Sequence, residues 1–115
     1  MANFVCSCQE VKDVFVVRCN GYLDDKGGTQ VRNAVENSFA KGFQKVILNF
    51  KDSPVINSQG ISHIIEIAEL VVEDRQGKLF FVGLSELVNS VFKTVGLLRM
   101  AEACPDEEEA LRAMS

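Results

Sequence analysis

KVILNF, at residues 45–50, constrains the architecture more than any other part of the chain, because it is almost continuously apolar. Runs of this kind are typical of strands that are covered on both faces, as in a sheet flanked by helices. LFFV, at residues 79–82, is a second such run. Between them, residues 58–75 carry apolar side chains at helical spacing, and Gly77 follows as a terminator. This order predicts two parallel strands joined by a crossover helix.

The N-terminal part extends this alternation of strands and helices. Residues 4–8 and 13–19 are short and rich in β-branched or aromatic side chains, which predicts two strands joined through residues 9–12. Residues 21–28 include three glycines and are expected to be a polar loop. Apolar side chains at helical spacing then predict a helix over about residues 26–41.

Two of the expected helices each have one apolar stripe to bury. For residues 58–75 the stripe is Ile61, Ile64, Ile65, Ala68 and Val72. A further helix capped by Ser85 is expected to turn inward the side chains of Leu87, Val88, Val91, Phe92 and Val95.

The C-terminal part completes the predicted fold. A short strand is expected within residues 98–103. Asp106 stands three residues before a glutamate, so the acidic run 106–109 fits a helix cap better than a binding patch. Together the segments predict an α/β fold, with a mixed sheet of about four to five strands and about four helices packed against it. The length of 115 residues indicates a single domain spanning residues 1–115.

The composition argues against several classes of function. The formal net charge is -4, and Lys and Arg are scattered singly, so no basic face for nucleic acid is expected. No apolar run approaches the roughly 20 residues that span a bilayer, so direct membrane insertion is not expected. The N-terminus lacks the basic and apolar regions of a signal peptide, which favours a cytoplasmic location.

The cysteines and the single histidine do not form a recognisable metal or catalytic motif. Cys6 and Cys8 have a spacing that is unusual for zinc, so inert, reduced thiols are favoured over metal or redox use. His63 lies five residues after Ser58, on the wrong side of a helix for a serine–histidine site. We therefore expect His63 to be an exposed helix residue, and we expect a protein without metal or cofactor that is not an enzyme.

Several pieces in a definite order carry a resemblance to a known family. They are Gly21-Tyr22-Leu23-Asp24, the strand 46–50, the motif Asn57-Ser58-Gln59-Gly60, the turn and strand 77–83, the helix 85–94 with Val95-Gly96-Leu97, and the tail 107–111. Their order and spacing resemble the STAS domain family, of the anti-sigma factor antagonist type, over nearly the whole chain.

The resemblance implies a STAS-like fold and a regulatory binding protein. In that family the antagonist binds an anti-sigma factor, and usually a serine kinase as well, and so frees a sigma factor. The kinase phosphorylates the serine that follows the motif aspartate, which breaks the complex, and a phosphatase restores it. By motif match the phosphoacceptor is Ser58, and the expected partner-binding residues are Asp24, Asn57, Ser58, Gln59, Gly60 and Ile61.

Ser58 also has a purely structural interpretation. At the start of a helix its hydroxyl can cap free backbone N–H groups. A phosphate there would add about -1.5 to -2 charges, which a helix N-terminus tolerates and an apolar or acidic partner surface does not. Asn57 replaces the motif aspartate and Gln59 replaces the second hydroxyl. Constitutive binding, or a switch other than phosphate, therefore stays open as an alternative.

Other functions are weighed beside this one. One is a STAS scaffold subunit of a larger complex, such as a transport ATPase or a signalling assembly. Another is an enzyme or small-ligand binder that shares only the fold. Val55, Ile56 and Ile61 are candidates for an exposed apolar docking patch near the motif. A weak homodimer is a further partnership to test.

Overall fold

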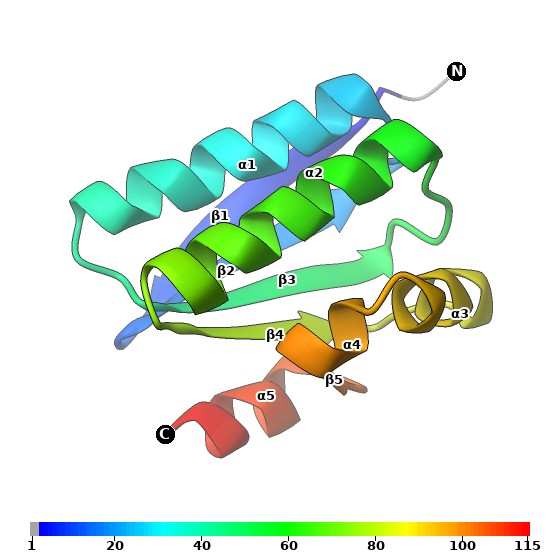
Figure 1. The fold of residues 1–115 in the computed structure, drawn as a ribbon. Helices are drawn as coiled ribbons and strands as arrows, with labels where there is room; N and C mark the ends of the chain where they lie inside the picture. The colour runs from blue at the N-terminus through cyan, green and yellow to red at the C-terminus, as the bar shows by residue number, and fades with distance from the viewer. Residues whose placement is uncertain (1–2) are drawn as a thin grey trace.

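A computed structural model describes residues 3–115 as a mixed five-stranded sheet with helices on both faces (Figure 1). The strands are β1 (Val5–Val11), β2 (Val14–Asn20), β3 (Lys45–Asp52), β4 (Lys78–Val82) and β5 (Glu102–Cys104). The helices are α1 (Asp25–Ala40), α2 (Ser58–Ala68), α3 (Glu86–Thr94), α4 (Leu97–Met100) and α5 (Glu107–Met114), with a π-helical segment η1 (Glu69–Asp74) continuing α2. The predicted α/β class and mixed sheet are confirmed.

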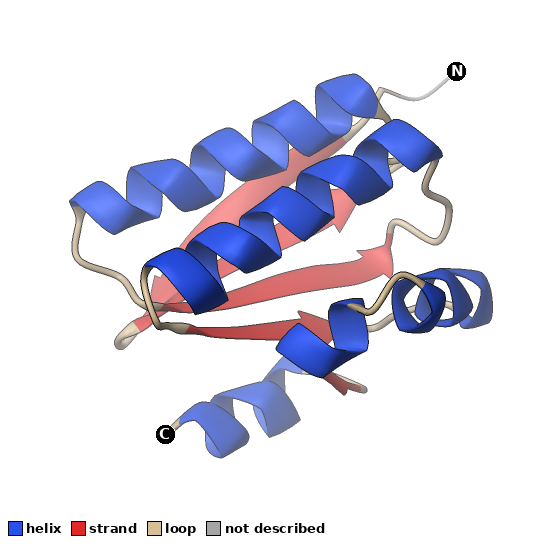
Figure 2. Ribbon diagram, viewed as in Figure 1, coloured by secondary structure: helices blue, strands red, loops and turns tan. Residues whose placement is uncertain are grey.

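The strands lie in the sheet in their chain order, β1-β2-β3-β4-β5. β1 and β2 are an antiparallel hairpin, whereas β2, β3, β4 and β5 are parallel neighbours. The crossover helices α1 and α2 lie on one face of the sheet, and α5 covers the other (Figure 2). The two apolar runs at residues 45–50 and 79–82 are therefore confirmed as adjacent parallel strands.

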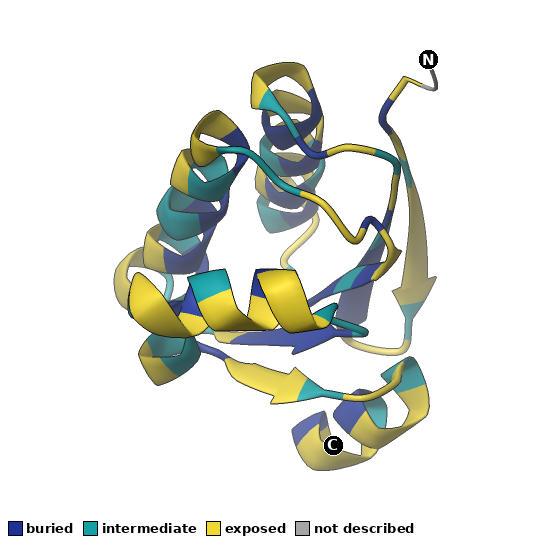
Figure 3. Cartoon of the chain, turned by 90° about the vertical axis from the view of Figure 1, so that its right-hand side faces the viewer, coloured by how far each residue is buried: buried dark blue, intermediate teal, exposed yellow. Residues whose placement is uncertain are grey.

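Alternate side chains of the strands fill two separate cores. On the face of α1 and α2, Leu48 and Phe50 of β3 are buried, and the Phe50 ring lies 5.6 Å from the Phe92 ring of α3 between centroids. On the opposite face, Ile47 packs in the cluster that contains Met114 of α5. The central strands are accordingly buried between the layers of helices (Figure 3), as the continuous apolar run predicts.

The boundaries near the N-terminus differ from the sequence prediction. β1 continues to Val11, so the turn consists of Lys12 and Asp13 alone, with Lys12 at φ +55°. The expected polar loop 21–28 is also too long. Helix α1 begins at Asp25, because the side chain of Asp24 caps it and the following glycines are accommodated in its first turn.

The buried stripe of α2 is rotated from the predicted one. Its buried residues are Gly60, Ile64, Ile67 and Ala68, and Ile61, Ile65 and Val72 are half-buried. The reason is the close approach of the helix to the chain at Gly60, which turns that side of α2 inward. The helical stretch also changes to the wider π-helical winding from Glu69 onward.

The region after β4 departs furthest from the prediction. Leu87 and Val95 were expected to point inward but are 55% and 44% exposed, because α3 is covered on one side only and buries Val88 and Phe92. The first half of the segment expected as a short strand at 98–103 instead lies in α4, and the strand β5 begins only at Glu102. The fold therefore has one helix more than predicted.

Candidate functional site

The loops that precede α1 and α2 are joined to each other. Leu23 and Ile56 form an isolated parallel bridge. The amide of Leu23 donates to the carbonyl of Val55 at 3.1 Å, and the amide of Asn57 donates to the carbonyl of Leu23 at 3.1 Å. The two helices therefore start side by side at one edge of the molecule (Figure 1). This brings together Asp24 and the motif at residues 57–60, which are far apart in sequence.

Both helix starts are capped by the residue just before the helix. Asp24 Oδ1 accepts from the amide of Gly27 at 2.8 Å, and Asn57 Oδ1 accepts from the amide of Gly60 at 2.9 Å. The alternative in which Ser58 serves as the cap is therefore wrong. Ser58 is the first residue of α2 and its side chain is exposed. Its hydroxyl is consequently available at the surface.

Gly60 has a structural reason to lack a side chain. A Cβ at this position would lie 2.3 Å from the carbonyl oxygen of Leu23 and 3.0 Å from Cγ1 of Ile56. The glycine is buried, so it holds α2 against the neighbouring loop rather than facing solvent. Because Gly60 is buried, a partner would contact its exposed neighbours instead of Gly60 itself.

The remaining expected partner residues lie at the surface to different degrees. Ser58 and Gln59 are exposed, and Asp24, Asn57 and Ile61 are half-buried. Together with the buried Gly60 they form one continuous region, which we call the α2-start face. No feature of this geometry requires a metal, and among residues 3–115 no cluster of three or more His, Cys, Asp or Glu side chains is arranged to hold one.

Apolar side chains flank the α2-start face. Val55 is 45% exposed, and Ile56 and Ile61 are half-buried beside it. Tyr22, on the adjoining loop, is 44% exposed and was missed by the sequence reasoning. Its position inside the Gly-Tyr-Leu-Asp segment was the available signal. Exposed apolar side chains around a polar centre are the composition expected of a docking surface.

The loop that carries Val55 is also tied to α3. Ser85 Oγ donates to the carbonyl of Pro54 at 2.9 Å and accepts from the amide of Val88 at 3.1 Å. On the other side, the buried Ser53 donates from Oγ to the carbonyl of Gly21 at 2.7 Å. These bonds fix the loop from both directions, so the α2-start face is preorganised by the fold.

His63 joins α1 to α2 beneath this face. It was expected to be exposed, but only 16% of its side chain is accessible, and Nε2 lies 2.8 Å from Asp25 Oδ1. Gly28 makes room for the ring, because a Cβ there would lie 2.5 Å from Cδ2 of His63. The contact was missed because Asp25 is distant in sequence. His63 packs toward α1, which fits a positioning role for the two helix starts.

The acidic start of α5 is engaged within the fold. Asp106 Oδ1 accepts from the amide of Glu109 at 2.9 Å, which confirms the predicted cap. Arg18 donates to both carboxylate oxygens of Glu107 at 2.8 Å, and Asn49 Nδ2 donates to one of them at 2.6 Å. The hydrogen bond from Arg18 is the main cause that lowers the pKa of Glu107. This region therefore stabilises the fold.

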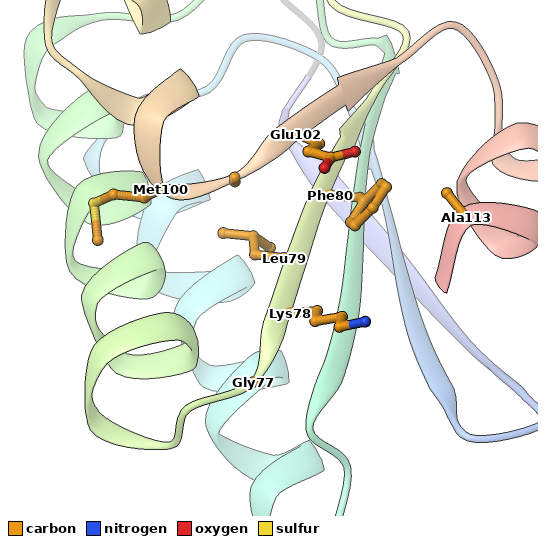
Figure 4. Close-up of a pocket in the computed structure, with 8 residues that line it drawn as sticks. Gly77, Lys78, Leu79, Phe80, Met100, Glu102 and Ala113 are labelled. Atoms are coloured by element: carbon orange, nitrogen blue, oxygen red, sulfur yellow. The ribbon is translucent and has the colours of Figure 1, made fainter. Parts of the chain in front are cut away.

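Two surface hollows lie away from the α2-start face. One of about 490 Å³ is lined by residues around the Arg18–Glu107 pair. Another, of about 380 Å³, lies where β4 extends past the short β5, and its lining includes Lys78, Met100 and Glu102 (Figure 4). In residues 3–115 no helix has both the length and the apolar character needed to cross a membrane.

Comparisons with known proteins agree with this geometry. The STAS domain family profile matches residues 6–110. An anti-sigma factor antagonist from Mycobacterium paratuberculosis is 15% identical, with a TM-score of 0.84, covering 97% of this chain and 94% of its own. The Bacillus cell fate determinant SpoIIAA in its phosphorylated form is 21% identical, with a TM-score of 0.77, covering 96% and 100%.

A transporter also contains a similar fold. An anion transporter of the murine solute carrier 26 family is 17% identical, with a TM-score of 0.76, covering 92% of this chain but 18% of the transporter. At these identities the structural likenesses establish the fold alone. No curated protein sequence matches the chain significantly.

Proposed function

Because the chain belongs to the STAS domain family, we propose that it is a regulatory protein of the anti-sigma factor antagonist type, acting in the cytoplasm by binding an anti-sigma factor or a serine kinase. The observation that carries this proposal is the α2-start face, where exposed Ser58 and Gln59 stand among exposed Tyr22 and Val55. In this proposal the protein acts by binding its partner, and it catalyses no reaction.

The proposed contact has the composition of a protein interface. The partner would cover the apolar side chains on the two bridged loops. The polar residues between them would fix the orientation of the partner. The hydrogen bonds of Leu23 and Ser85 hold both loops in place before binding. A preorganised surface loses little conformational entropy on association, which favours affinity from a small area.

Ser58 is the proposed phosphoacceptor. Its exposed position at the first turn of α2 would let a kinase reach it without unfolding the helix. A phosphate there would carry about -1.5 to -2 charges beside the positive end of the helix dipole. The first turn of α2 contains no acidic side chain that would repel it. The phosphate would repel a partner seated over the same face.

Asn57 caps α2 as an aspartate would, but it carries no negative charge. The amide oxygen keeps the hydrogen bond to Gly60, so the loop geometry needs no carboxylate. If kinase recognition depends on that negative charge, binding by this protein is constitutive instead of switched. Phosphorylation and binding are therefore separable parts of the proposal.

A second candidate is a scaffold role within a larger assembly. Its support is the structural likeness to part of an anion transporter, of which the match covers 18%. In that role the α2-start face would bind a neighbouring subunit permanently. Affinity capture from the native cell distinguishes the two: a serine kinase or sigma regulator would favour the switch, and membrane transport subunits would favour the scaffold.

The test of the switch is intact mass after incubation with ATP and the kinase encoded nearest in the same genome. Wild type should gain one phosphate, Ser58→Ala should gain none, and Ser62→Ala should behave as wild type. Ser62 is the matched control, because it is exposed on the same helix one turn later. If the protein gains no phosphate but forms a stable complex with the kinase, its binding is constitutive. If it neither gains phosphate nor forms the complex, the proposal is refuted.

A further inference from the structure

Two cysteines face each other across the β1–β2 hairpin. Cys6 of β1 is the direct partner of Cys19 of β2, in a register that runs residue for residue along both strands. Both thiols are free in this structure, and Cys19 is buried whereas Cys6 is half-buried. Both side chains pack against the core on the face of α1 and α2, so they leave the sheet in the same direction.

The hairpin places this pair at a position where side chains approach closely. Val11 and Val14 flank the two-residue turn and are directly paired, so they exchange both hydrogen bonds. Hydrogen-bonded and non-hydrogen-bonded pairs alternate along an antiparallel ladder, which makes Cys6 and Cys19 a non-hydrogen-bonded pair. The amide of Gly21, two residues after Cys19, agrees with this alternation, because it donates to the end of β3 at 2.9 Å and so points away from β1.

The separation of such a pair suits a disulfide. Non-hydrogen-bonded partners have Cα atoms about 4.5 Å apart, and disulfides span Cα separations of about 4.4–6.8 Å. Burial is the main cause that raises the pKa of Cys19, and the nearby thiols of Cys6 and Cys8 raise it further. Burial also raises the pKa of Cys6. Few thiolates are therefore present near neutral pH, so the pair stays reduced until an oxidant is supplied.

We propose that Cys6 and Cys19 are a redox modification site, at which a peroxide converts the two thiols into a reversible disulfide that joins β1 to β2. The spacing of Cys6 and Cys8, which underlies the expectation of inert thiols, does not reveal this pairing, because it depends on the register of the hairpin. The proposal is independent of partner binding at the α2-start face.

The oxidation consumes one hydrogen peroxide for two thiols. The sulfur of Cys6, the more accessible of the two, attacks one peroxide oxygen. An S–O bond forms, the O–O bond breaks, and hydroxide leaves and takes up the thiol proton as water. The sulfur of Cys19 then attacks the sulfenic acid on Cys6. The S–S bond forms, the S–O bond breaks, and a second water leaves with the proton of Cys19. Both sulfurs are oxidised, the peroxide is reduced to two waters, and an external thiol can reverse the bond.

The disulfide would fix the start of β1 against the first turn of α1. Phe4, two residues before Cys6, is buried, and a Cβ at Gly27 would lie 2.8 Å from its ring. The bond would also close a loop of about fourteen residues, which removes conformational freedom from the unfolded chain. The oxidised protein should therefore be more stable than the reduced protein, with a Tm about 10 °C higher.

The first test locates the bond after the folded full chain is treated with hydrogen peroxide. A thiol label added under denaturing conditions should then react with two cysteines instead of four. Trypsin should release residues 1–12 joined to residues 19–26, and a reductant should separate them. Cys6→Ser and Cys19→Ala should each lose this linkage. Cys8→Ser is the matched control and should keep it, because the residue opposite Cys8 is not a cysteine. Circular dichroism verifies that the variants are folded.

The second test compares thermal unfolding of the oxidised and reduced forms. Oxidised wild type should melt about 10 °C above reduced wild type, and the difference should vanish in Cys6→Ser. Four reactive thiols after peroxide treatment, a linkage that survives Cys6→Ser, or a bond between Cys6 and Cys8 within residues 1–12 would overturn the proposal. It would equally be overturned by a cross-link that joins only two separate molecules, or by an oxidised form that melts no higher than the reduced form.

Discussion

Replacing Gly60 by alanine tests whether the contact between α2 and the neighbouring loop organises the site. The added Cβ would lie 2.3 Å from the carbonyl oxygen of Leu23, a backbone atom that cannot rotate away. Restoring ordinary contact requires a shift of about 1 Å between α2 and the loop, which is an overpacking event. That shift stretches the hydrogen bond from Asn57 to Leu23, now 3.1 Å long.

The expected change in the free energy of unfolding combines one stabilising and two destabilising contributions. Alanine favours a helix over glycine by about 1 kcal/mol, which stabilises the variant. Overpacking costs roughly 1–3 kcal/mol, and each weakened hydrogen bond costs about 1 kcal/mol. The steric contributions exceed the helical gain, so we expect Gly60→Ala to lower the free energy of unfolding by about 2 kcal/mol.

The assay is equilibrium unfolding in urea, with the slope of the transition monitored for constancy. Gly42→Ala serves as the control, because a Cβ there meets nothing within 4 Å and only the positive φ of +90° opposes it. That strain alone should cost about 1 kcal/mol. A Gly60→Ala protein as stable as wild type would refute the close-contact argument.

Three further variants test other parts of the structure. Asn57→Ala should lower stability by about 1 kcal/mol through loss of the helix cap, whereas Asn57→Asp should keep it; thermal unfolding of both checks this. Phe92→Ala should cost about 3–5 kcal/mol, because the ring is fully buried among other aromatic rings, as urea unfolding would show. Glu107→Gln should weaken the partly exposed pair with Arg18 by about 1 kcal/mol near neutral pH. Because folding lowers the pKa of Glu107, its stabilisation is present above the unfolded pKa and is lost as pH falls through the folded pKa, so wild type and Glu107→Gln should converge in stability in acid.

The fold was largely predictable because it depends on local patterns. The runs at 45–50 and 79–82 have a composition that suits only buried strands, and Asp106 lies at the spacing of a cap. The orientation of α3 was not predictable, since Leu87 is apolar but lies where no other element covers it. A prediction from helical periodicity assumes that every apolar side chain of the helix is covered by another element. In α3 only the side that carries Val88 and Phe92 is covered.

The sequence identified the residues of the candidate site more accurately than it identified their roles. The motif was located, but the capping role belongs to Asn57, because the helix starts one residue earlier than a serine cap requires. The contacts of His63 with Asp25 and of Leu23 with Val55 join residues more than thirty positions apart. Such pairings depend on how the crossover helices are placed, which no local pattern encodes.

The position of α5 has a consequence for how the protein is made. Its second core, containing Ile47, Phe80 and Met114, closes only when α5 docks, and α5 is the last of the described elements to be synthesised. A nascent chain that already contains β1 to β4 therefore keeps an apolar sheet surface uncovered on the ribosome. Domains that expose such surfaces during translation depend on chaperones until the missing element arrives. Truncation before residue 106 should accordingly yield chains that aggregate, even with the α2-start face intact.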